Sequence, residues 1–469
     1  MPPRHLNFIL ITAAISLLCY VTHRRTRSAM LIGDAVNLID AFYVEPVDRD
    51  TLLTSAMKGL TDGLDEHSEY IPGEAYATFQ DNMHQEFAGI GIFVEPQDDG
   101  QPVRVVTPLV GSPALLAGLL PGDEIIGVDG EDVSSMSLQE VSTKLRGPIG
   151  TQVRLKLRRG DKPQITKPSE DETDPLGTTE PEEPKTVLEV TVTRDRIQLN
   201  SVLGDYRDED DKWVYRLKDD SSIAYLRMTS FGEKTEAELR KALNELNNDF
   251  DALVLDLRGN GGGLLNSAVE IADMFLESGN IVSTRIRGGV IEDNFDATPG
   301  TLVSLDKPIA ILIDGSSASA SEIVAAAIKD NGRGIVVGTR SYGKGTVQNI
   351  LPLQYGRSAL RLTVARYYRP NGVNIHRGKD DKDEDPWGVS PDERGLAELQ
   401  PEDIEKIAQR WKVASYPSLG SPESDDAQSL ESGILIDPQL RRAVELVREA
   451  LELTREKTDS SAEPTANAA

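Results

Sequence analysis

The sequence predicts a mixed α/β protein of several domains, and three observations support this class. The chain has 469 residues, which is more than one ordinary domain of about 100 to 200 residues contains. Hydrophobic residues make up 39% of it, so a large core can form. From residue 197 onward, apolar runs typical of strands alternate with runs typical of helices, and repeated βα units indicate an α/β core.

The charge and the cysteine content exclude several classes of function. Lys and Arg number 50 against 77 Asp and Glu, a net charge of −27, which repels phosphate backbones, so we expect no nucleic-acid partner. Cys19 is the single cysteine. A single cysteine excludes an intramolecular disulfide, an all-cysteine zinc site and a cysteine redox pair. Any nucleophile must therefore be another residue type.

Residues 1–29 are predicted to be a signal or anchor segment. Residues 8–21 form an apolar run behind Arg4, shorter than the about 20 residues of a usual membrane-spanning helix. No small-residue cleavage site follows this run. We therefore expect an uncleaved anchor or an inefficiently cleaved signal, which would place the protein outside the cytoplasm, in the periplasm or cell envelope. The alternative is an ordinary core helix.

Two regions of different character follow. Residues 30–86 have apolar residues at three- and four-residue spacing, which predicts an N-terminal helical region. Residues 87–196 contain short strand-like runs separated by Gly and Pro, which predicts a small β-rich domain. Within it, residues 161–184 hold eight acidic residues and five prolines, so we expect a disordered insert there.

Residues 197–412 carry the α/β alternation and are predicted to form the core. The expected elements are strand 223–228, helix 233–248, strand 252–257, helix 264–277, strand 308–313, helix 321–329 and strand 335–338. Residues 413–469 are predicted to be a tail, in which residues 437–454 have the apolar spacing of an amphipathic helix.

Two turns rich in small residues are candidates for chemistry. Residues 314–322 (DGSSASASE) lead from an apolar run into a helix, where free N–H groups and the helix dipole can stabilise an oxyanion. Residues 256–264 (DLRGNGGGL) form a similar turn, whose glycines let backbone N–H groups face a cleft. Taken alone, the first could be a capped Ser/Ala loop and the second a tight βα turn.

A third turn, residues 338–346 (GTRSYGKGT), supplies a candidate base. It nearly matches the phosphate-binding pattern GxxxxGK(S/T), but Gly345 replaces the Mg²⁺-binding hydroxyl, so nucleotide binding is disfavoured. The five histidines lie outside all three turns, although the fold could bring one close. A lysine can activate a serine when burial lowers its pKa from about 10.4 toward about 7 to 8, so Lys344 is the candidate base.

Motifs along most of the chain occur in the order found in one protease family. They are residues 64–70 (LDEHSEY), 89–92 (GIGI), 120–125 (LPGDEI), 145–147 (LRG), Phe231, 256–258 (DLR), 317–322 (SASASE), 343–348 (GKGTVQ) and 362–368 (LTVARYY). With them the sequence resembles the carboxyl-terminal processing peptidases, or tail-specific proteases, although Glu66 replaces the family's proline. The resemblance implies a crotonase-like α/β protease core, an inserted PDZ domain and an N-terminal helical region.

Carried over by position, the resemblance makes Ser319 the nucleophile and Lys344 its general base, 25 residues later. Gln348, the third member in some relatives, would orient the lysine. The serine would be acylated and then released by water, as in other serine proteases.

The resemblance also implies the supporting groups. The oxyanion donors would be the backbone N–H groups of Ala320 and Gly262, with Gly263 as the alternative. Asp330 matches an acid functionally implicated in a relative. Its plain alternative is a polar residue at the end of a helix.

The substrate class follows from the PDZ domain. PDZ domains bind a free C-terminal carboxylate with backbone N–H groups while the peptide adds a strand to the sheet. Gly89, Ile90, Gly91 and Ile92 would form the carboxylate loop, and Arg146 would sense the bound tail. The implied activity is that of a serine endopeptidase cleaving protein substrates near their C-termini, without a metal or organic cofactor.

Two other classes of function share some of these features. A PDZ scaffold with an inactive protease-like domain is one, but intact Ser319, Lys344 and Gln348 argue against it. A crotonase-type acyl-CoA enzyme is the other, and it needs neither a Ser-Lys pair nor a PDZ domain. The expected partners are proteins or peptides with free C-termini and, through residues 1–29, a membrane. A monomer and a homo-oligomer both remain open.

Overall fold

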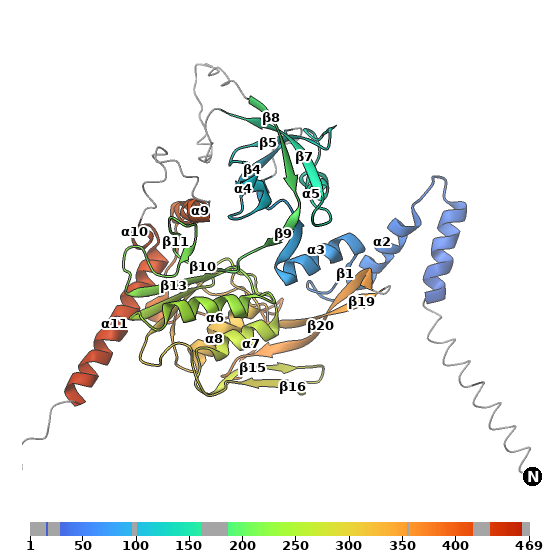
Figure 1. The fold of residues 1–469 in the computed structure, drawn as a ribbon. Coiled ribbons are helices and arrows are strands. Elements are labelled where there is room, and N and C mark those ends of the chain that lie inside the picture. Colours follow the sequence, from blue (N-terminus) through green and yellow to red (C-terminus); the bar gives the residue numbers. More distant parts are fainter. Residues whose placement is uncertain are drawn as a thin grey trace, which may run out of the picture. The chain divides into compact units, whose positions relative to one another are not determined.

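The computed structural model describes residues 16, 29–95, 101–160, 186–353, 356–415 and 432–461. Within these ranges helices and strands are mixed (Figure 1), which confirms the predicted α/β multidomain class. The chain divides into two compact units. One contains Met1–Thr78 and Val347–Val364, and the other contains Phe79–Thr346 and Ala365–Ala469.

The first unit combines helices with a short antiparallel sheet. Residues 29–42 are helical, and α2 (Arg49–Thr61) begins after Asp48, whose side chain accepts a hydrogen bond from the Thr51 N–H at 2.8 Å. β1 (Glu69–Ile71) pairs with residues 359–361 of β20 (Ser358–Tyr368), which also pairs with β19 (Thr346–Leu353). The region predicted to be helical therefore contains a strand as well.

α3 (Gly73–His84) leads into a six-stranded sheet, where the sequence predicts a PDZ domain. Its strands are β3 (Ile92–Glu95), β4 (Val103–Pro108), β5 (Glu124–Val128), β6 (Glu131–Asp132), β7 (Gln152–Arg159) and β8 (Thr186–Thr193), in the order β3-β4-β5-β7-β8 with β6 beside β5. α4 (Pro113–Leu116) and α5 (Leu138–Leu145) pack on a core that includes Val105, Ile125 and Leu155. β2 (Glu86–Gly89) and β9 (Asp195–Gln198) pair where the chain enters and leaves this region.

The α/β core is built on a second sheet, in the order β10-β13-β14-β17-β18. Its strands are β10 (Val202–Leu203), β13 (Ile223–Met228), β14 (Ala252–Asp256), β17 (Ile309–Ile313) and β18 (Ile335–Gly338), and the last four are parallel. Every residue of β14 and β17 is buried, as expected for a parallel sheet covered on both faces. The four strands predicted here are confirmed to within one residue at each end.

Helices cover this sheet. α6 (Thr235–Leu246), α7 (Leu265–Asp273) and α8 (Ala320–Asp330) each follow a strand in the chain and lie side by side in Figure 1. α11 (Pro438–Ser461) packs Leu440, Val444 and Val447 against alternate residues of the strands, including Val254 and Leu312. The predicted amphipathic helix 437–454 is confirmed as part of α11.

The remaining elements lie around these layers. β11 (Tyr206–Arg207) pairs with β12 (Trp213–Val214), and β15 (Asn280–Arg285) pairs with β16 (Ile291–Asp296) and with residues 366–368 of β20; η2 (Glu393–Gly395), α9 (Pro401–Ser415) and α10 (Gly433–Ile436) precede α11. No helix in the described ranges is long and apolar enough to cross a membrane. The predicted anchor run, apart from Ser16, and the acidic insert 161–184 lie outside the described residues.

Candidate active site

The two small-residue turns meet because they follow neighbouring parallel strands. β14 and β17 are hydrogen-bonded neighbours, so the turns after them lie at the same edge of the sheet. The Asp314 carboxylate accepts a hydrogen bond from the Gly259 N–H at 3.1 Å. The Asn260 carbonyl accepts from the Ala318 N–H at 3.0 Å and from Ser321 Oγ at 2.8 Å. These bonds hold the two turns together as one structure.

Ser319 occupies the junction between its turn and α8. It has φ 56° and ψ −112°, a region that residues other than glycine rarely adopt and that is found most often at functional sites. The residue is 7% exposed. Its position directly before the helix sets the side chain beside the positive end of the helix dipole.

Gly262 packs directly on this junction. Its φ is 98°, and a Cβ placed there would lie 2.8 Å from Ser319 Cβ and 2.9 Å from the Ala320 nitrogen. Only glycine fits so close a backbone approach. The two predicted oxyanion donors are therefore adjacent, although the Gly262 N–H donates to Asn260 Oδ1 at 2.9 Å in this structure. Gly263, the alternative donor, packs against Phe231.

The loop that carries Lys344 is held by the segment after β20. A Cβ on Gly343 would lie 2.9 Å from Trp387 Cε3, and a Cβ on Gly345 would overlap the backbone nitrogen of His376. Glycine is therefore required on both sides of Lys344. The lysine itself is half-buried.

Glu322, in the first turn of α8, joins the loop to the nucleophile turn. Its Oε2 accepts hydrogen bonds from the N–H groups of Ser319 at 2.7 Å and Lys344 at 2.9 Å. Its Oε1 accepts from Ser341 Oγ at 2.6 Å and from the Gly343 N–H at 2.7 Å. Burial raises the pKa of Glu322 to about 7, although the four hydrogen bonds favour the charged form. One buried carboxylate thus sets the spacing between the two loops.

Arg258 attaches the glycine turn to α11. Its guanidinium donates to Asp256 at 2.6 Å, and to Asp437 and Gln439 at 3.1 Å each. Burial acts to raise the pKa of Asp256, but Arg258 outweighs it and holds this pKa at about 2, so the pair is ionised at neutral pH. A cavity of about 610 Å³ borders Arg258 and α9, but neither Ser319 nor Lys344 lines it.

The five residues predicted to bind a C-terminal carboxylate line one cavity of about 110 Å³ beside β3. They are Gly89, Ile90, Gly91, Ile92 and Arg146, and the wall is completed by Phe87, Val94, Val141, Ser142 and Leu145. Arg146 forms an ion pair with Asp81 of α3 at 3.3 Å and lies over the Phe87 ring. The cavity lies between α5 and the start of β3, which is suited to an added strand.

Comparisons with known proteins identify the family. A model of peptidase family S41 matches residues 222–394, and a PDZ-domain model matches residues 104–159. The chain is 38% identical to a carboxy-terminal-processing protease of Bartonella bacilliformis, over 73% of this chain and 71% of that protein. The chain belongs to the carboxy-terminal processing proteases of family S41.

Other members are similar over comparable lengths. The carboxy-terminal processing protease CtpB of Bacillus subtilis is 31% identical over 91% of this chain and 79% of that protein. A solved photosystem II D1 C-terminal processing protease is 29% identical, with a TM-score of 0.41 and coverage of 80% of this chain and 93% of that one. Membership confirms the predicted enzyme class, a serine peptidase with a PDZ domain.

The residues predicted for catalysis fall in both compact units of this S41 protease. Ser319, Lys344, Gly262 and Ala320 belong to the second unit. Gln348 belongs to the first unit, in β19, where its Nε2 donates to Thr363 Oγ1 at 3.4 Å. Glu322 joins the serine loop to the lysine loop through hydrogen bonds. The hydrogen bond of Gln348 is instead to Thr363 of β20.

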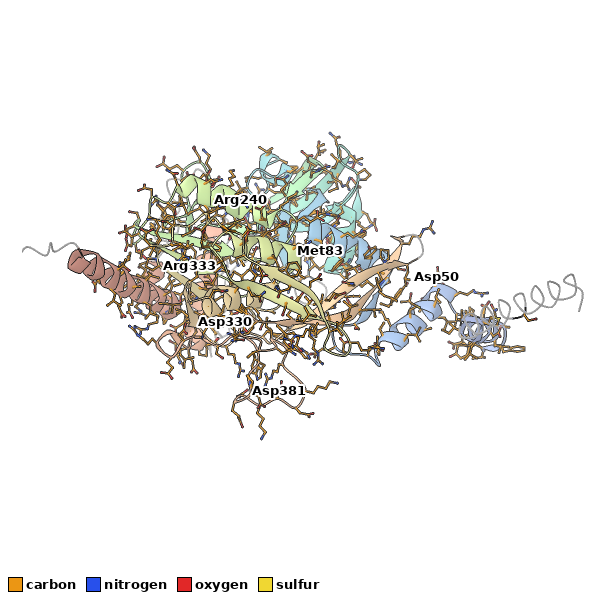
Figure 2. All side chains as sticks on the ribbon, turned by 90° about the horizontal axis from the view of Figure 1, so that it is seen from below. Asp50, Met83, Arg240, Asp330, Arg333 and Asp381 are labelled. Atoms are coloured by element: carbon orange, nitrogen blue, oxygen red, sulfur yellow. The ribbon has the colours of Figure 1, made fainter. Side chains whose placement is uncertain are left out.

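Asp330, labelled in Figure 2, pairs with Arg369 at the far end of α8. Two hydrogen bonds of 2.5 and 3.0 Å join the carboxylate to the guanidinium. Eleven helical residues at about 1.5 Å each separate Asp330 from Ser319 by roughly 16 Å. The geometry favours the interpretation of Asp330 as a helix-end residue in an ion pair.

Two buried residues beside the proposed dyad received no role from sequence reasoning. Glu322 has the S-x-x-E spacing of a capping box, which could have indicated its bond to the Ser319 N–H. Tyr367, in β20, is 4% exposed, and its backbone N–H donates to the carbonyl oxygen of Gly345, next to Lys344, at 2.9 Å. No local pattern signals this contact, because the partner lies 22 residues earlier.

Proposed function

We propose that this protease cleaves protein substrates near their C-termini by acyl transfer through a Ser319–Lys344 dyad. The observation that carries the proposal is the single oxygen of Glu322 that binds the backbone N–H groups of both residues, at 2.7 and 2.9 Å. A nucleophile and its base must come within hydrogen-bond reach, and one atom holding both backbones supports that pairing. The positive φ of Ser319 supports it as well.

In the proposed reaction, neutral Lys344 takes the proton of Ser319 Oγ as this oxygen attacks the scissile carbonyl carbon. The carbonyl electron pair moves onto oxygen. Lys344 then gives the proton to the leaving nitrogen as the C–N bond breaks, and an acyl group remains on Ser319. Lys344 next takes a proton from a water whose oxygen attacks the ester carbonyl carbon. It gives this proton to Ser319 Oγ as the C–Oγ bond breaks, which releases the acid and restores the serine. Gln348 is proposed to orient the lysine.

The oxyanion is proposed to bind the backbone N–H groups of Ala320 and Gly262. As the first residue of α8, Ala320 has an N–H without a partner inside the helix, and the helix dipole favours negative charge there. The Gly262 N–H must leave Asn260 Oδ1 when the oxyanion forms. Gly263 is the alternative second donor.

The PDZ domain is proposed to bind the free C-terminal carboxylate of the substrate. The backbone of residues 89–92 lines the 110 Å³ cavity, and the N–H groups of such a loop bind carboxylates. Arg146 now pairs with Asp81, so an incoming carboxylate would compete for the arginine, which gives Arg146 its role as a sensor. The net charge of −27 makes general attraction of an anion ineffective, so a local site is required.

We also propose a crotonase-like fold for the core, the domain limits 30–86, 87–196, 197–412 and 413–469, and a location outside the cytoplasm reached through residues 1–29. The proposed chemistry needs no metal or organic cofactor. Fusing residues 1–29 to alkaline phosphatase, which is active only outside the cytoplasm, tests the location. If cells produce the fusion protein but show no phosphatase activity, the proposed location is refuted.

Labelling with a serine-reactive fluorophosphonate, followed by peptide mapping, tests the central proposal. The label should map to Ser319 and disappear in Ser319→Ala together with cleavage of a tailed protein. Ser316→Ala is the matched control, because Ser316 is an exposed serine of the same turn, and it should keep both. Full activity of Ser319→Ala would refute the assignment.

A further inference from the structure

The cavity of about 610 Å³ beside α9, the α9 cavity, also borders the two turns of the proposed active site. Its lining includes Gly259 of the glycine turn and residues 314–316 of the nucleophile turn. It lies at the carboxyl ends of the parallel strands, where α/β folds bind ligands. Its volume falls in the range of small-molecule sites, about 300 to 1,000 Å³. The α9 cavity is therefore a candidate for a binding site that is separate from the dyad.

One wall of this cavity is apolar and belongs to α9. Ile404, Ile407 and Trp411 line it, and their spacing of three and four residues places them on one face of the helix. A buried ion pair of 2.7 Å between Arg410 and Asp205 fixes the helix to the core. Ile404 is still 55% exposed, so a ligand would remove apolar surface from water. The wall is thus preformed and suits an apolar ligand.

Four charged residues line the α9 cavity, and the fold already uses two of them. Arg258 forms ion pairs with two buried aspartates. The Asp314 carboxylate accepts hydrogen bonds from the N–H groups of Gly259 at 3.1 Å and Ser316 at 2.9 Å. A ligand could bind Arg258 or Asp314 only by competing with these bonds.

The other two charged residues are Arg227, in β13, and Glu398, shortly before α9. Neither side chain forms a hydrogen bond or an ion pair with any residue that the structure describes. The Arg227 guanidinium lies over the Trp411 ring, 4.3 Å from its centroid. Its neighbour on β14, Asp256, is paired with Arg258. The α9 cavity thus offers a ligand one cation, one anion and an apolar wall.

We propose that the α9 cavity binds a short apolar peptide whose two termini are both free. The peptide's carboxylate would pair with Arg227 and its ammonium group with Glu398, while its side chains pack on α9. A peptide of about three residues is of the size that cavities of this volume bind. The inference rests on the proposed function, because cleavage near a C-terminus releases short peptides with two free termini. The α9 cavity would then bind a product of the reaction.

The PDZ cavity is the other place where such a peptide would bind, and its requirements differ. A PDZ domain recognises the carboxylate and adds the peptide to its sheet as a strand, so it does not need a free N-terminus. The α9 cavity requires both termini. Acetylating the peptide's N-terminus should therefore weaken binding at the α9 cavity alone.

Photo-crosslinking in the full Ser319→Ala chain tests the proposal without turnover. The probe is a tripeptide with free termini and a photoreactive benzoylphenylalanine between two alanines, and the cross-linked residues are mapped by mass spectrometry. Cross-links are expected in α9, and N-acetylation of the probe should remove them. Arg227→Gln and Glu398→Gln should each raise the half-saturating probe concentration at α9 by about 10-fold or more, whereas Arg227→Lys keeps the charge and should cost less.

Glu405→Gln is the matched control, because Glu405 is an exposed glutamate of α9 outside the cavity lining, and it should bind the probe as the parent chain does. Glu398 is exposed as well, so its substitution keeps the test valid even if Arg227→Gln fails to fold. The absence of cross-links in α9, or α9 cross-links that survive N-acetylation or Glu398→Gln unchanged, would overturn the inference. Absence of fluorophosphonate labelling at Ser319 in the unmodified chain would instead refute the proposed function, so the two failures are distinguishable.

Discussion

Replacing Glu322 with glutamine separates the stability of this site from its activity. The carboxylate accepts four hydrogen bonds, from the N–H groups of Ser319, Lys344 and Gly343 and from Ser341 Oγ. A glutamine amide has one accepting oxygen and one donating NH₂ group. If the NH₂ faces Ser341, that hydroxyl can turn to accept, but the Gly343 N–H loses its acceptor. The other orientation leaves the N–H groups of both Ser319 and Lys344 without one.

The pKa of Glu322 sets the size and sign of the effect on stability. It rises from 4.5 to about 7 on folding, so the wild-type fold favours the protonated acid. Its contribution to stability is complete below about pH 4.5 and is lost as the pH rises through about 7. At about 1.4 kcal/mol per pKa unit, the loss is about 3 kcal/mol. Glutamine does not titrate, so between pH 5 and pH 8 the variant should gain about 2 to 3 kcal/mol relative to wild type.

Activity should move in the opposite direction. With an acceptor lost, the nucleophile turn and the base loop can shift, and a misplacement of about 1 Å can cost about 100-fold in rate. We expect kcat of Glu322→Gln at pH 8 to be about 10- to 100-fold below wild type. The assays are urea unfolding at pH 5 and pH 8 and peptide hydrolysis at pH 8. Glu277→Gln, at an exposed glutamate of the same unit, is the control and should behave as wild type in both.

A difference in unfolding free energy between Glu322→Gln and wild type that stays constant with pH would refute the buried, perturbed carboxylate. Wild-type turnover in the variant would refute its role in holding the two loops. Because all other groups are shared by the two proteins, their contributions cancel in the difference.

Three further outcomes are expected. Lys344→Arg should abolish cleavage and Ser319 labelling, because arginine keeps the charge but cannot give up a proton near neutral pH; near-normal turnover would mean that another group is the base. Gly262→Ala should lower kcat at least about 100-fold, since its Cβ would lie 2.6 Å from the Ala318 carbonyl oxygen at a φ of 98°, whereas Gly261→Ala, with open space around its Cβ, should be tolerated; equal rates would remove Gly262 from the oxyanion site. Amidating the substrate's C-terminus should weaken binding to the PDZ domain about 10- to 150-fold, as measured by fluorescence anisotropy on Ser319→Ala, and equal affinities would show that the domain recognises something else.

Local patterns predicted the strands of the core well. β13, β14 and β17 are mainly apolar runs bounded by turns, and a parallel sheet covered on both faces favours such runs. β1 could not be predicted in the same way. Its three residues form a strand because they pair with residues 359–361, almost 300 positions later, and only the fold brings those segments together.

The same contrast applies to the candidate site. The turn of Ser319 and the glycine turn could be located because the requirement for small residues is local. The bonds from Glu322 to the lysine loop could not be predicted, because they join this carboxylate to groups 19 to 22 residues later. The pairing of Asp330 with Arg369 depends on which strand returns beside α8, a property of the topology and not of the helix.

Arg258 connects parts of the chain that are synthesised at different times. It belongs to the turn that holds Gly262, and it binds Asp437 and Gln439, which follow 179 and 181 residues later. At about 5 to 20 residues per second on the ribosome, the arginine waits roughly 10 to 40 seconds for them. We expect the glycine turn to be completed only when residues 437–439 have emerged, and to be lost again in a copy cut before Asp437, which fluorophosphonate labelling of such a truncated chain would test. A C-terminal processing protease would then depend on an intact segment far along its own chain.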